Sequence, residues 1–259
     1  MEKKIGNSIF GKRNVREYIK KKLSGNDRDW SVKEVLVKKN PSKDIIEEIL
    51  NHIPQKIKIS YLSQGDLDSL LPGKNHQGIV LLNAERAQTF NYKNFEDLLE
   101  LLQLKKEPIL VLDRILDTGN LGNILRTAEC FGIKHIIVPE RDMAPINDTV
   151  LRISSGAVYH LNIYRVVNLK NSLEKLKSFD YWIAITSDQG NEDWSNLPPK
   201  ENLVIVLGNE EKGVKRLIHE NSDYQLRIPL HGSISSLNVT VSCGIILDRI
   251  INMPENRSF

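Results

Sequence analysis

The chain of 259 residues has little cysteine and little aromatic content, with two cysteines and 6% Phe, Trp and Tyr. It also lacks a long apolar run: a bilayer-spanning helix needs about 20 apolar residues, and a run such as Leu203 to Leu207 is far shorter. The amino terminus opens with charged residues and not with an apolar signal core. Cys130 and Cys243 stand in apolar helical patterns, which predict buried thiols rather than a disulfide or a nucleophile. We therefore expect a cytoplasmic protein without a membrane partner or redox chemistry.

Metal and dinucleotide signatures are missing as well. The six histidines are isolated in sequence, and no pair has the spacing of metal ligands, so no metal site is expected. A dinucleotide-binding loop needs three glycines and an acidic residue about 20 positions later. Here Gly119 and Gly122 stand without a third glycine, and no acidic residue closes a convincing second strand. A nicotinamide enzyme is therefore disfavoured.

What the chain does have is a globular balance, with 40% hydrophobic and 27% charged residues, and a net charge of +3. This composition fits one large domain or two of ordinary size. The charge is uneven, because residues 1–22 carry eight Lys and Arg against two Glu, or +6. A basic arm followed by a basic helix suits a phosphate backbone, although a solvated helix face explains it equally well.

The pattern of strands and helices divides the chain into three parts. Residues 1–82 mix basic helical stretches with short strands at 34–37, 57–61 and 78–82, which predicts a small α/β domain. Residues 83–106 form a linker, polar at first and then amphipathic over 95–104, a helix that can pack on either neighbour. The third part, residues 107–259, shows a regular alternation of strands and helices.

In residues 107–259 short apolar strands alternate with helical patterns. Such alternation predicts an α/β domain with a mostly parallel sheet and helices on both faces. The expected strands are 109–113, 135–138, 161–165, 182–186, 203–207 and 225–228, and the expected helices start near 120, 147, 173, 214 and 237.

Three glycine-punctuated stretches follow strands of this domain. They run from Asp117 to Arg126, from Leu207 to Gly213 and from Ile228 to Asn238. Because ligands of open α/β sheets bind at the carboxyl ends of the strands, we expect the three stretches to gather there. This predicts a polar site beside a tight, backbone-lined pocket.

Taken together, these stretches resemble the motifs of the SpoU (TrmH-like) RNA 2′-O-ribose methyltransferases. The first motif corresponds to residues 113–132, the second to 207–214, and the third to 228–230 with 235–239. Residues 9–11 and 75–79 are similar to the small RNA-binding domain of the subgroup that modifies large-subunit ribosomal RNA. Two positions depart from the family pattern, Thr118 in place of proline and Glu211 in place of glycine.

The resemblance implies a deep trefoil knot in the second domain, a homodimer formed through that domain, and S-adenosylmethionine as cofactor. Glycines and apolar side chains in the knotted loops suit adenine, which backbone groups recognise. The corresponding positions of this chain are Thr186, Leu207, Gly208, Gly213, Ile228, Leu230, Ser236 and Leu237.

The resemblance also implies four catalytic residues, Asn120, Arg126, Glu210 and Asn238. Since a guanidinium is always protonated, we interpret Arg126 as a clamp on the substrate phosphate and the developing alkoxide, not as a base. Glu210 then anchors Arg126 or takes part in proton transfer. The amides of the two asparagines both donate and accept, which suits fixing a ribose hydroxyl or a neighbouring side chain. Taken singly, both asparagines also fit helix caps, and Glu210 fits a partner for a helix dipole.

RNA contacts are expected from basic and polar residues of both domains. These are Lys12, Arg13, Arg16, His76, Gln77, Arg141 and Arg152. The leading hypothesis is a ribose methyltransferase acting on a guanosine of large-subunit ribosomal RNA. The alternatives are a transfer RNA substrate, a non-catalytic RNA-binding ribosome-assembly factor, and an unrelated α/β enzyme acting on a small molecule.

Overall fold

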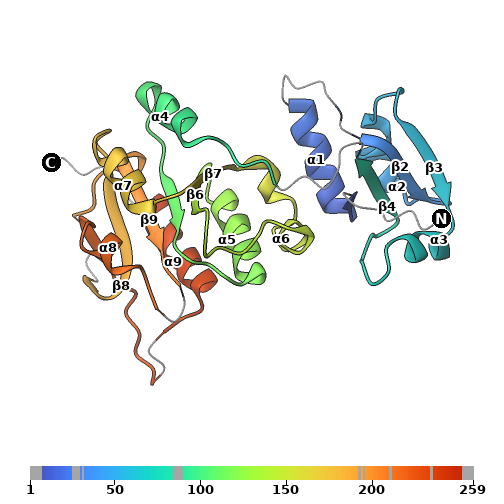
Figure 1. The fold of residues 1–259 in the computed structure, drawn as a ribbon. Coiled ribbons are helices and arrows are strands. Elements are labelled where there is room, and N and C mark those ends of the chain that lie inside the picture. The colour runs from blue at the N-terminus through green and yellow to red at the C-terminus, as the bar shows by residue number, and fades with distance from the viewer. Residues whose placement is uncertain are drawn as a thin grey trace. The chain divides into compact units, whose positions relative to one another are not determined.

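The computed structural model describes residues 8–24, 30, 32–83, 90–191, 194, 196–209, 212–233 and 236–252. The chain divides into two compact units (Figure 1). Unit 1 consists of Met1–Asn91 and Asn147–Tyr159, and unit 2 of Tyr92–Ile146 and His160–Phe259. The domain limits predicted at residues 82 and 106 stay predictions.

Unit 1 is built on a four-stranded mixed sheet with the order β1-β4-β2-β3. The strand β2 is parallel to β3 and antiparallel to β4, which is antiparallel to β1. In chain order the elements are β1 (Ser8–Phe10), α1 (Lys12–Ser24), β2 (Val32–Lys38), α2 (Lys43–Glu48), η1 (Leu50–His52), β3 (Lys58–Leu62), α3 (Gln64–Leu70) and β4 (Ile79–Asn83), followed by α6 (Asp148–Ile153) and η2 (Ala157–His160).

Two separate cores hold unit 1 together, one on each face of its sheet. Val35 and Val37 of β2 lie in a core with residues of α1 and α2, whereas Leu36 faces a smaller core with Leu67 of α3. This change of face with each residue is the period of a β-strand. Tyr159 packs against the first core, and its ring lies 5.6 Å from that of Tyr18.

Unit 2 contains a six-stranded sheet with the order β10-β8-β9-β5-β6-β7, in which every neighbouring pair is parallel. The α/β fold class predicted from the alternation of strands and helices is confirmed. The elements are α4 (Phe95–Leu104), β5 (Ile109–Leu112), α5 (Thr118–Cys130), β6 (His135–Pro139), β7 (Asn162–Val166), α7 (Leu169–Lys177), β8 (Trp182–Asn191), η3 (Lys200–Asn202), β9 (Leu203–Leu207), α8 (Arg216–His219), β10 (Tyr224–Leu226) and α9 (Val239–Ile251).

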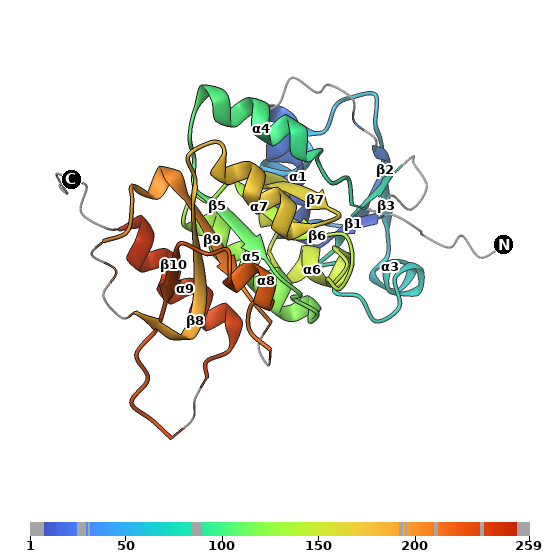
Figure 2. The ribbon, with the colours of Figure 1, turned by 60° about the vertical axis from the view of Figure 1, so that its left-hand side comes forward.

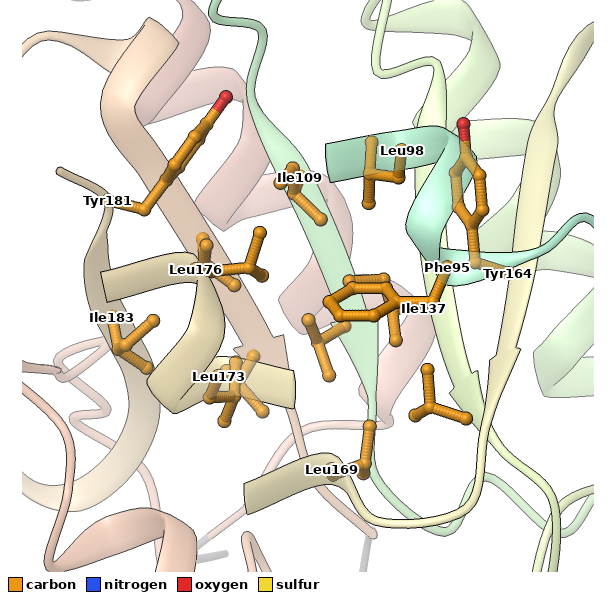
Figure 3. Packing of buried hydrophobic residues seen from close by; sticks show 14 of the residues in the cluster. Phe95, Leu98, Ile109, Ile137, Tyr164, Leu169, Leu173, Leu176, Tyr181 and Ile183 are labelled. Atoms are coloured by element: carbon orange, nitrogen blue, oxygen red, sulfur yellow. The ribbon is translucent and has the colours of Figure 1, made fainter. Parts of the chain in front are cut away.

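Both faces of this sheet are buried. Ile109 and Val111 belong to a core that α4 and α7 complete (Figure 3). Leu110 and Leu112, which are also fully buried, point to the other face, where α5 and α9 lie side by side (Figures 1 and 2). Since parallel sheets are covered on both faces, their strands are continuous apolar runs.

The helix α4 belongs to unit 2. It has the limits predicted for the amphipathic helix of the linker, and Asn94 caps it by accepting a hydrogen bond from the backbone N–H of Glu96 at 3.4 Å. Its buried side chains, including Phe95, Leu98 and Leu102, join the core of unit 2. Burial of each contributes about 1.5–3 kcal/mol relative to an exposed position. The neighbour of this helix, which the sequence left open, is therefore the parallel sheet.

Two expectations about the fold need correction or addition. Cys243 is buried, as predicted, and burial raises the pKa of its thiol to about 12. Cys130 is exposed, because it lies at the end of α5 away from the face that packs on the sheet. The strand β1 was not expected. None of the described helices is both long and apolar enough to cross a membrane.

A polar network lies at the amino ends of β5, β6 and β7. The Nε2 of His135 is 3.1 Å from Glu107, and its Nδ1 is 3.0 Å from the hydroxyl of Tyr164. Hydrogen bonds from Lys105, together with Lys134 and His135, hold the pKa of Glu107 at about 2. Burial lowers the pKa of His135, whose side chain is almost fully enclosed.

This network predicts a loss of stability in mild acid. Because the folded pKa of His135 lies below its ordinary value of about 6.5, the unfolded chain binds the proton more readily. The contribution of His135 is complete above about pH 6.5 and is lost as pH falls through the folded pKa. His135→Gln should remove this loss of unfolding free energy. The loss that remains comes from protonation of Glu107, which begins below about pH 4.5. Urea denaturation between about pH 7 and 5 measures it, with the exposed His52→Gln as control. Equal pH slopes for wild type and His135→Gln would contradict the assignment.

Candidate functional site

The three motifs meet at one edge of the sheet of unit 2. The strands β10, β8, β9 and β5 are consecutive neighbours and all parallel, so their carboxyl ends lie together. Asp113 follows β5, Gly208 follows β9, and Arg227 follows β10. The gathering predicted from the sequence is therefore built into the strand order.

Two of the four predicted catalytic residues are in direct contact. The amide nitrogen Nδ2 of Asn238 donates a hydrogen bond to Oδ1 of Asn120 at 3.1 Å. The two residues are 118 positions apart, and they come together because α5 and α9 pack against each other. Asn120 is half-buried and Asn238 is exposed, so the pair borders solvent.

Asn238 also caps α9. Its Oδ1 accepts a hydrogen bond from the backbone N–H of Thr240 at 2.8 Å. This bond determines which atom of the amide faces Asn120, because the oxygen is already directed at the helix. At α5 the capping residue is Asp117, which accepts from the backbone N–H of Asn120 at 2.7 Å. Asn238 is therefore a helix cap as well as the hydrogen-bond partner of Asn120. The side chain of Asn120 is not a cap, because Asp117 caps α5.

Arg126 lies elsewhere on α5. Six residues of an α-helix turn by about 600°, which places Arg126 about 120° around the axis from Asn120. Its side chain is exposed and makes no hydrogen bond or ion pair with any residue that the structure describes. Glu210, its predicted anchor, lies outside the described residues, as does Glu211. The chain therefore joins Asn120 to Asn238 but does not bring Arg126 to them.

The loop after β9 is unusually tight. A Cβ added to Gly208 would lie 2.3 Å from the carbonyl carbon of Gly213 and 2.4 Å from the nitrogen of Val214. Asn209 and Gly213 exchange backbone hydrogen bonds of 3.1 and 2.9 Å, and Gly213 has a φ of +59°. Glycine is thus required at 208 by contact and favoured at 213 by conformation.

A buried carboxylate fastens this loop to the end of β5. Asp113 is fully buried, and its Oδ2 accepts from the backbone N–H of Lys215 at 2.8 Å. Arg114 donates to the same carboxylate at 3.2 Å and to the carbonyl of Gly213 at 3.0 Å. Sequence reasoning assigned no role to Asp113 or Arg114. An acidic residue directly after a buried strand was the available signal.

The predicted cofactor residues line the same edge. Thr186 lies on β8, Leu207 is buried at the end of β9, and Leu237 and the exposed Ser236 precede α9. Ile228 and Leu230 follow β10 and are half-buried. Within the described part of the chain their peptide groups make no hydrogen bonds.

The predicted RNA-binding residues are spread over both units. Lys12, His76 and Gln77 surround one pocket of unit 1. Arg16 pairs with Glu48 at 2.8 Å, a hydrogen bond that raises its pKa. The others, Arg13 and Arg152 in unit 1 and Arg141 in unit 2, are exposed. Across the described ranges, no group of three or more His, Cys, Asp or Glu side chains is arranged to hold a metal ion.

Comparison with known sequences identifies the family. The profile of the "SpoU rRNA Methylase family" matches residues 107–248, more than half of the chain. A second profile, "RNA 2′-O ribose methyltransferase substrate binding", matches residues 8–88. The chain belongs to the SpoU rRNA methylase family. Membership makes it an RNA 2′-O-ribose methyltransferase, which confirms the reaction class predicted from the motifs and removes the unrelated small-molecule enzyme.

Individual relatives agree with this assignment. A Borreliella burgdorferi protein described as an "Uncharacterized tRNA/rRNA methyltransferase" is 40% identical over 82% of this chain and 94% of its own length. A Staphylococcus aureus protein, described as a candidate TrmH family tRNA/rRNA methyltransferase, is 33% identical over 92% and 93%. Among solved structures, the SpoU methyltransferase AviRb from Streptomyces viridochromogenes, in complex with the cofactor AdoMet, superimposes with a TM-score of 0.72 at 20% identity, covering 94% of this chain and 88% of AviRb.

The contact at Gly208 predicts a severe effect of the smallest possible side chain. Gly208→Ala places a Cβ against backbone atoms that cannot rotate away, so we expect a loss of about 3 kcal/mol in the free energy of unfolding, the upper end of the usual cost of overpacking. Gly232→Ala is the matched control, since nothing lies within 4 Å of its added Cβ. Urea denaturation of both variants measures the difference. If the two variants were equally stable, the loop would not have this close contact.

Proposed function

We propose that this protein methylates the ribose 2′-hydroxyl of a guanosine in large-subunit ribosomal RNA, using S-adenosylmethionine, as a cytoplasmic homodimer. The contact between Asn120 and Asn238 carries the proposal. It joins a residue of the first family motif to one of the third at the carboxyl edge of the sheet, beside the loop after β9. A non-catalytic assembly factor would have no need for this arrangement.

The residues present at that edge fit the cofactor. Ile228 and Leu230 offer apolar side chains together with peptide groups that have no partner in the described chain. Both features suit adenine, which has hydrogen-bonding edges and apolar faces. The tight turn at Gly208 lies at the end of β9, on the same carboxyl edge of the sheet. When bound, S-adenosylmethionine supplies an electrophilic methyl group on a sulfonium.

The asparagine pair can hold the acceptor hydroxyl. Nδ2 of Asn238 donates to Oδ1 of Asn120, and the two amides together carry the donor and acceptor groups that a hydroxyl uses. A ribose hydroxyl bound there would be held in one orientation, and alignment of this kind contributes up to about 7–11 kcal/mol to lowering a barrier. As the carbon–oxygen bond forms and the carbon–sulfur bond breaks, the hydroxyl proton leaves to a substrate phosphate or to water.

Arg126 serves a different part of the substrate. Its exposed guanidinium is suited to a phosphate, for which its planar fork offers paired donors. Because it leaves α5 about 120° from Asn120, we propose that it completes the site of the second copy in the dimer. The exposed Val241 on α9 is one apolar group that such an interface would cover. The deep trefoil knot expected for the family is part of this proposal.

The RNA substrate has two candidates. Ribosomal RNA is supported by the description of the family profile over residues 107–248, which names rRNA, and by the resemblance of residues 9–11 and 75–79 to the subgroup that modifies the large subunit. The names of the relatives include transfer RNA as well. A transfer RNA guanosine is therefore the second candidate.

Asn238→Asp separates the two roles of Asn238. An aspartate still caps α9 and suits the positive end of the helix dipole, so stability should change by less than about 0.5 kcal/mol. The donor to Asn120 is lost, and we expect methyl transfer to fall at least about tenfold. Asn238→Ala, which also removes the cap, should in addition lose about 1 kcal/mol of stability. Wild-type turnover by Asn238→Asp would show that the amide contact has no catalytic role.

The decisive experiment is incubation of the purified protein with labelled S-adenosylmethionine and separate unmodified ribosomal and transfer RNAs, followed by mapping of the methylated ribose. Label in one guanosine of the large ribosomal RNA is the expected result.

Arg126→Ala should reduce transfer by about 100-fold or more while cofactor affinity is retained. Asn123→Ala, on the exposed side of the same helix, is the matched control.

Other outcomes of this assay are equally informative. Label confined to transfer RNA would retain the chemistry and replace the substrate. No label in either RNA or in precursor ribosomal particles, from a folded protein, would contradict the proposed activity.

A further inference from the structure

Unit 1 contains a polar pocket of about 580 Å³. It forms where the turn between β1 and α1, the loop after β2 and the loop before β4 come together. This volume is in the range of small-ligand sites. Among the described residues that line it there is no Phe, Trp or Tyr, the imidazole of His76 is only 2% exposed, and the apolar members are Pro41 and Ile45. A base has nothing to stack on here, whereas a charged or sugar-like group has many partners.

Lysine dominates the charge of this pocket. Lys12, Lys38 and Lys74 line it, against a single carboxylate, Asp68. Lys12 pairs with Asp44 at 2.7 Å, and Lys74 pairs with Asp148. Lys38 is exposed, and its ammonium has no hydrogen bond or ion pair within the described chain. An anion entering the pocket would therefore find one ammonium that acts on Asp68 through its charge alone, without a hydrogen bond or ion pair in the described chain, and two paired ammoniums nearby.

The carboxylate of Asp68 is already committed. His76 is only 2% exposed, and its Nδ1 accepts from the backbone N–H of Gly78 at 3.0 Å. Nε2 must then carry the proton in the neutral ring, and it donates to Asp68 at 2.9 Å. Gln64 donates to the same carboxylate at 3.0 Å. These bonds, with His76 as the largest cause, lower the pKa of Asp68. Both ring nitrogens of His76 are occupied, so its role here is to hold the loop.

The same loop presents a free amide. Gln77 and Gly78 both have left-handed backbones, with φ of +51° and +81°. Oε1 of Gln77 accepts from the backbone N–H of Lys12 at 2.8 Å. Its NH2 group therefore remains as a donor at the pocket wall. A Cβ added to Gly78 would lie 3.3 Å from Cβ of Lys38, which shows how close this loop runs to the unpaired lysine.

We propose that this pocket binds a phosphodiester of single-stranded RNA through Lys38, Lys12 and the NH2 group of Gln77. The inference rests on the proposed function, since it assigns the phosphate contact that places the substrate on unit 1. Because the lining has no aromatic platform, the pocket supplies affinity for any RNA and does not read a base. A free nucleotide shares the phosphate chemistry and is the alternative source.

Lys38→Gln tests the contact, and Lys33→Gln is its matched control. Both lysines are exposed on β2, about 16 Å apart along the strand, and Lys33 does not line the pocket. With polyuridylate and with a large-subunit ribosomal RNA transcript, Lys38→Gln should weaken binding about fivefold at about 0.1 M salt and reduce the salt slope by about 0.7–0.9. Lys33→Gln should match the wild type. The methylated position and turnover at saturating RNA should not change.

The outcomes separate the possible explanations. Equal RNA affinity and salt slope for Lys38→Gln, Lys33→Gln and wild type would overturn the proposal. Binding of uridine monophosphate that depends on Lys38, with RNA affinity unaffected, would overturn it in favour of a free nucleotide. Binding is measured without turnover, so weakened RNA affinity in Lys38→Gln supports the pocket even if no RNA is methylated. In that case the proposed function alone would fail.

Discussion

The close approach of residue 208 to residues 213 and 214 is the constraint on which the rest of the site depends. The added Cβ of any other residue would lie within 2.4 Å of backbone atoms on the far side of the loop. The loop can therefore close only around glycine, and closure brings the carbonyl of Gly213 to Arg114 and the N–H of Lys215 to Asp113. A buried carboxylate left without these partners would be strongly destabilising. Loop, carboxylate and strand end are thus mutually dependent.

This dependence extends to the catalytic edge through the strand order. The strand β9 lies between β5 and β8. The bonds of Asp113 and Arg114 that hold the loop after β9 therefore also fix that loop against the end of β5. Asn238 adds a second link of the same kind, since its oxygen starts α9 and its nitrogen reaches Asn120 on α5. Because one side chain both caps α9 and contacts Asn120, the position of this pair depends on the folding of the helix.

Sequence reasoning succeeded where short-range patterns decide the structure. The helix over 95–104 was predicted with its observed limits because its apolar residues recur at helical spacing. The strands of unit 2 were recognisable as continuous apolar runs. By contrast, β1 has three residues and too little pattern to recognise. The exposure of Cys130 and the role of Asp113 and Arg114 depend on contacts with residues distant in sequence. The assignment of Asn147–Tyr159 to unit 1 likewise depends on packing, such as that of Tyr159 on Tyr18.

The groups proposed to contact RNA, in the described parts of both units, suit a phosphate and a ribose and not a nucleobase. The lysine pocket of unit 1 suits a phosphodiester, which every RNA offers at each step. The pair Asn120 and Asn238 suits a ribose hydroxyl, which is just as general. If the proposed contacts hold, a single modified nucleotide is selected by the shape of the RNA, which has to present one unpaired ribose to the asparagine pair. On this argument, substitutions in the pocket change how tightly RNA binds and leave the choice of nucleotide intact, and an RNA altered in fold but not in local sequence would lose modification.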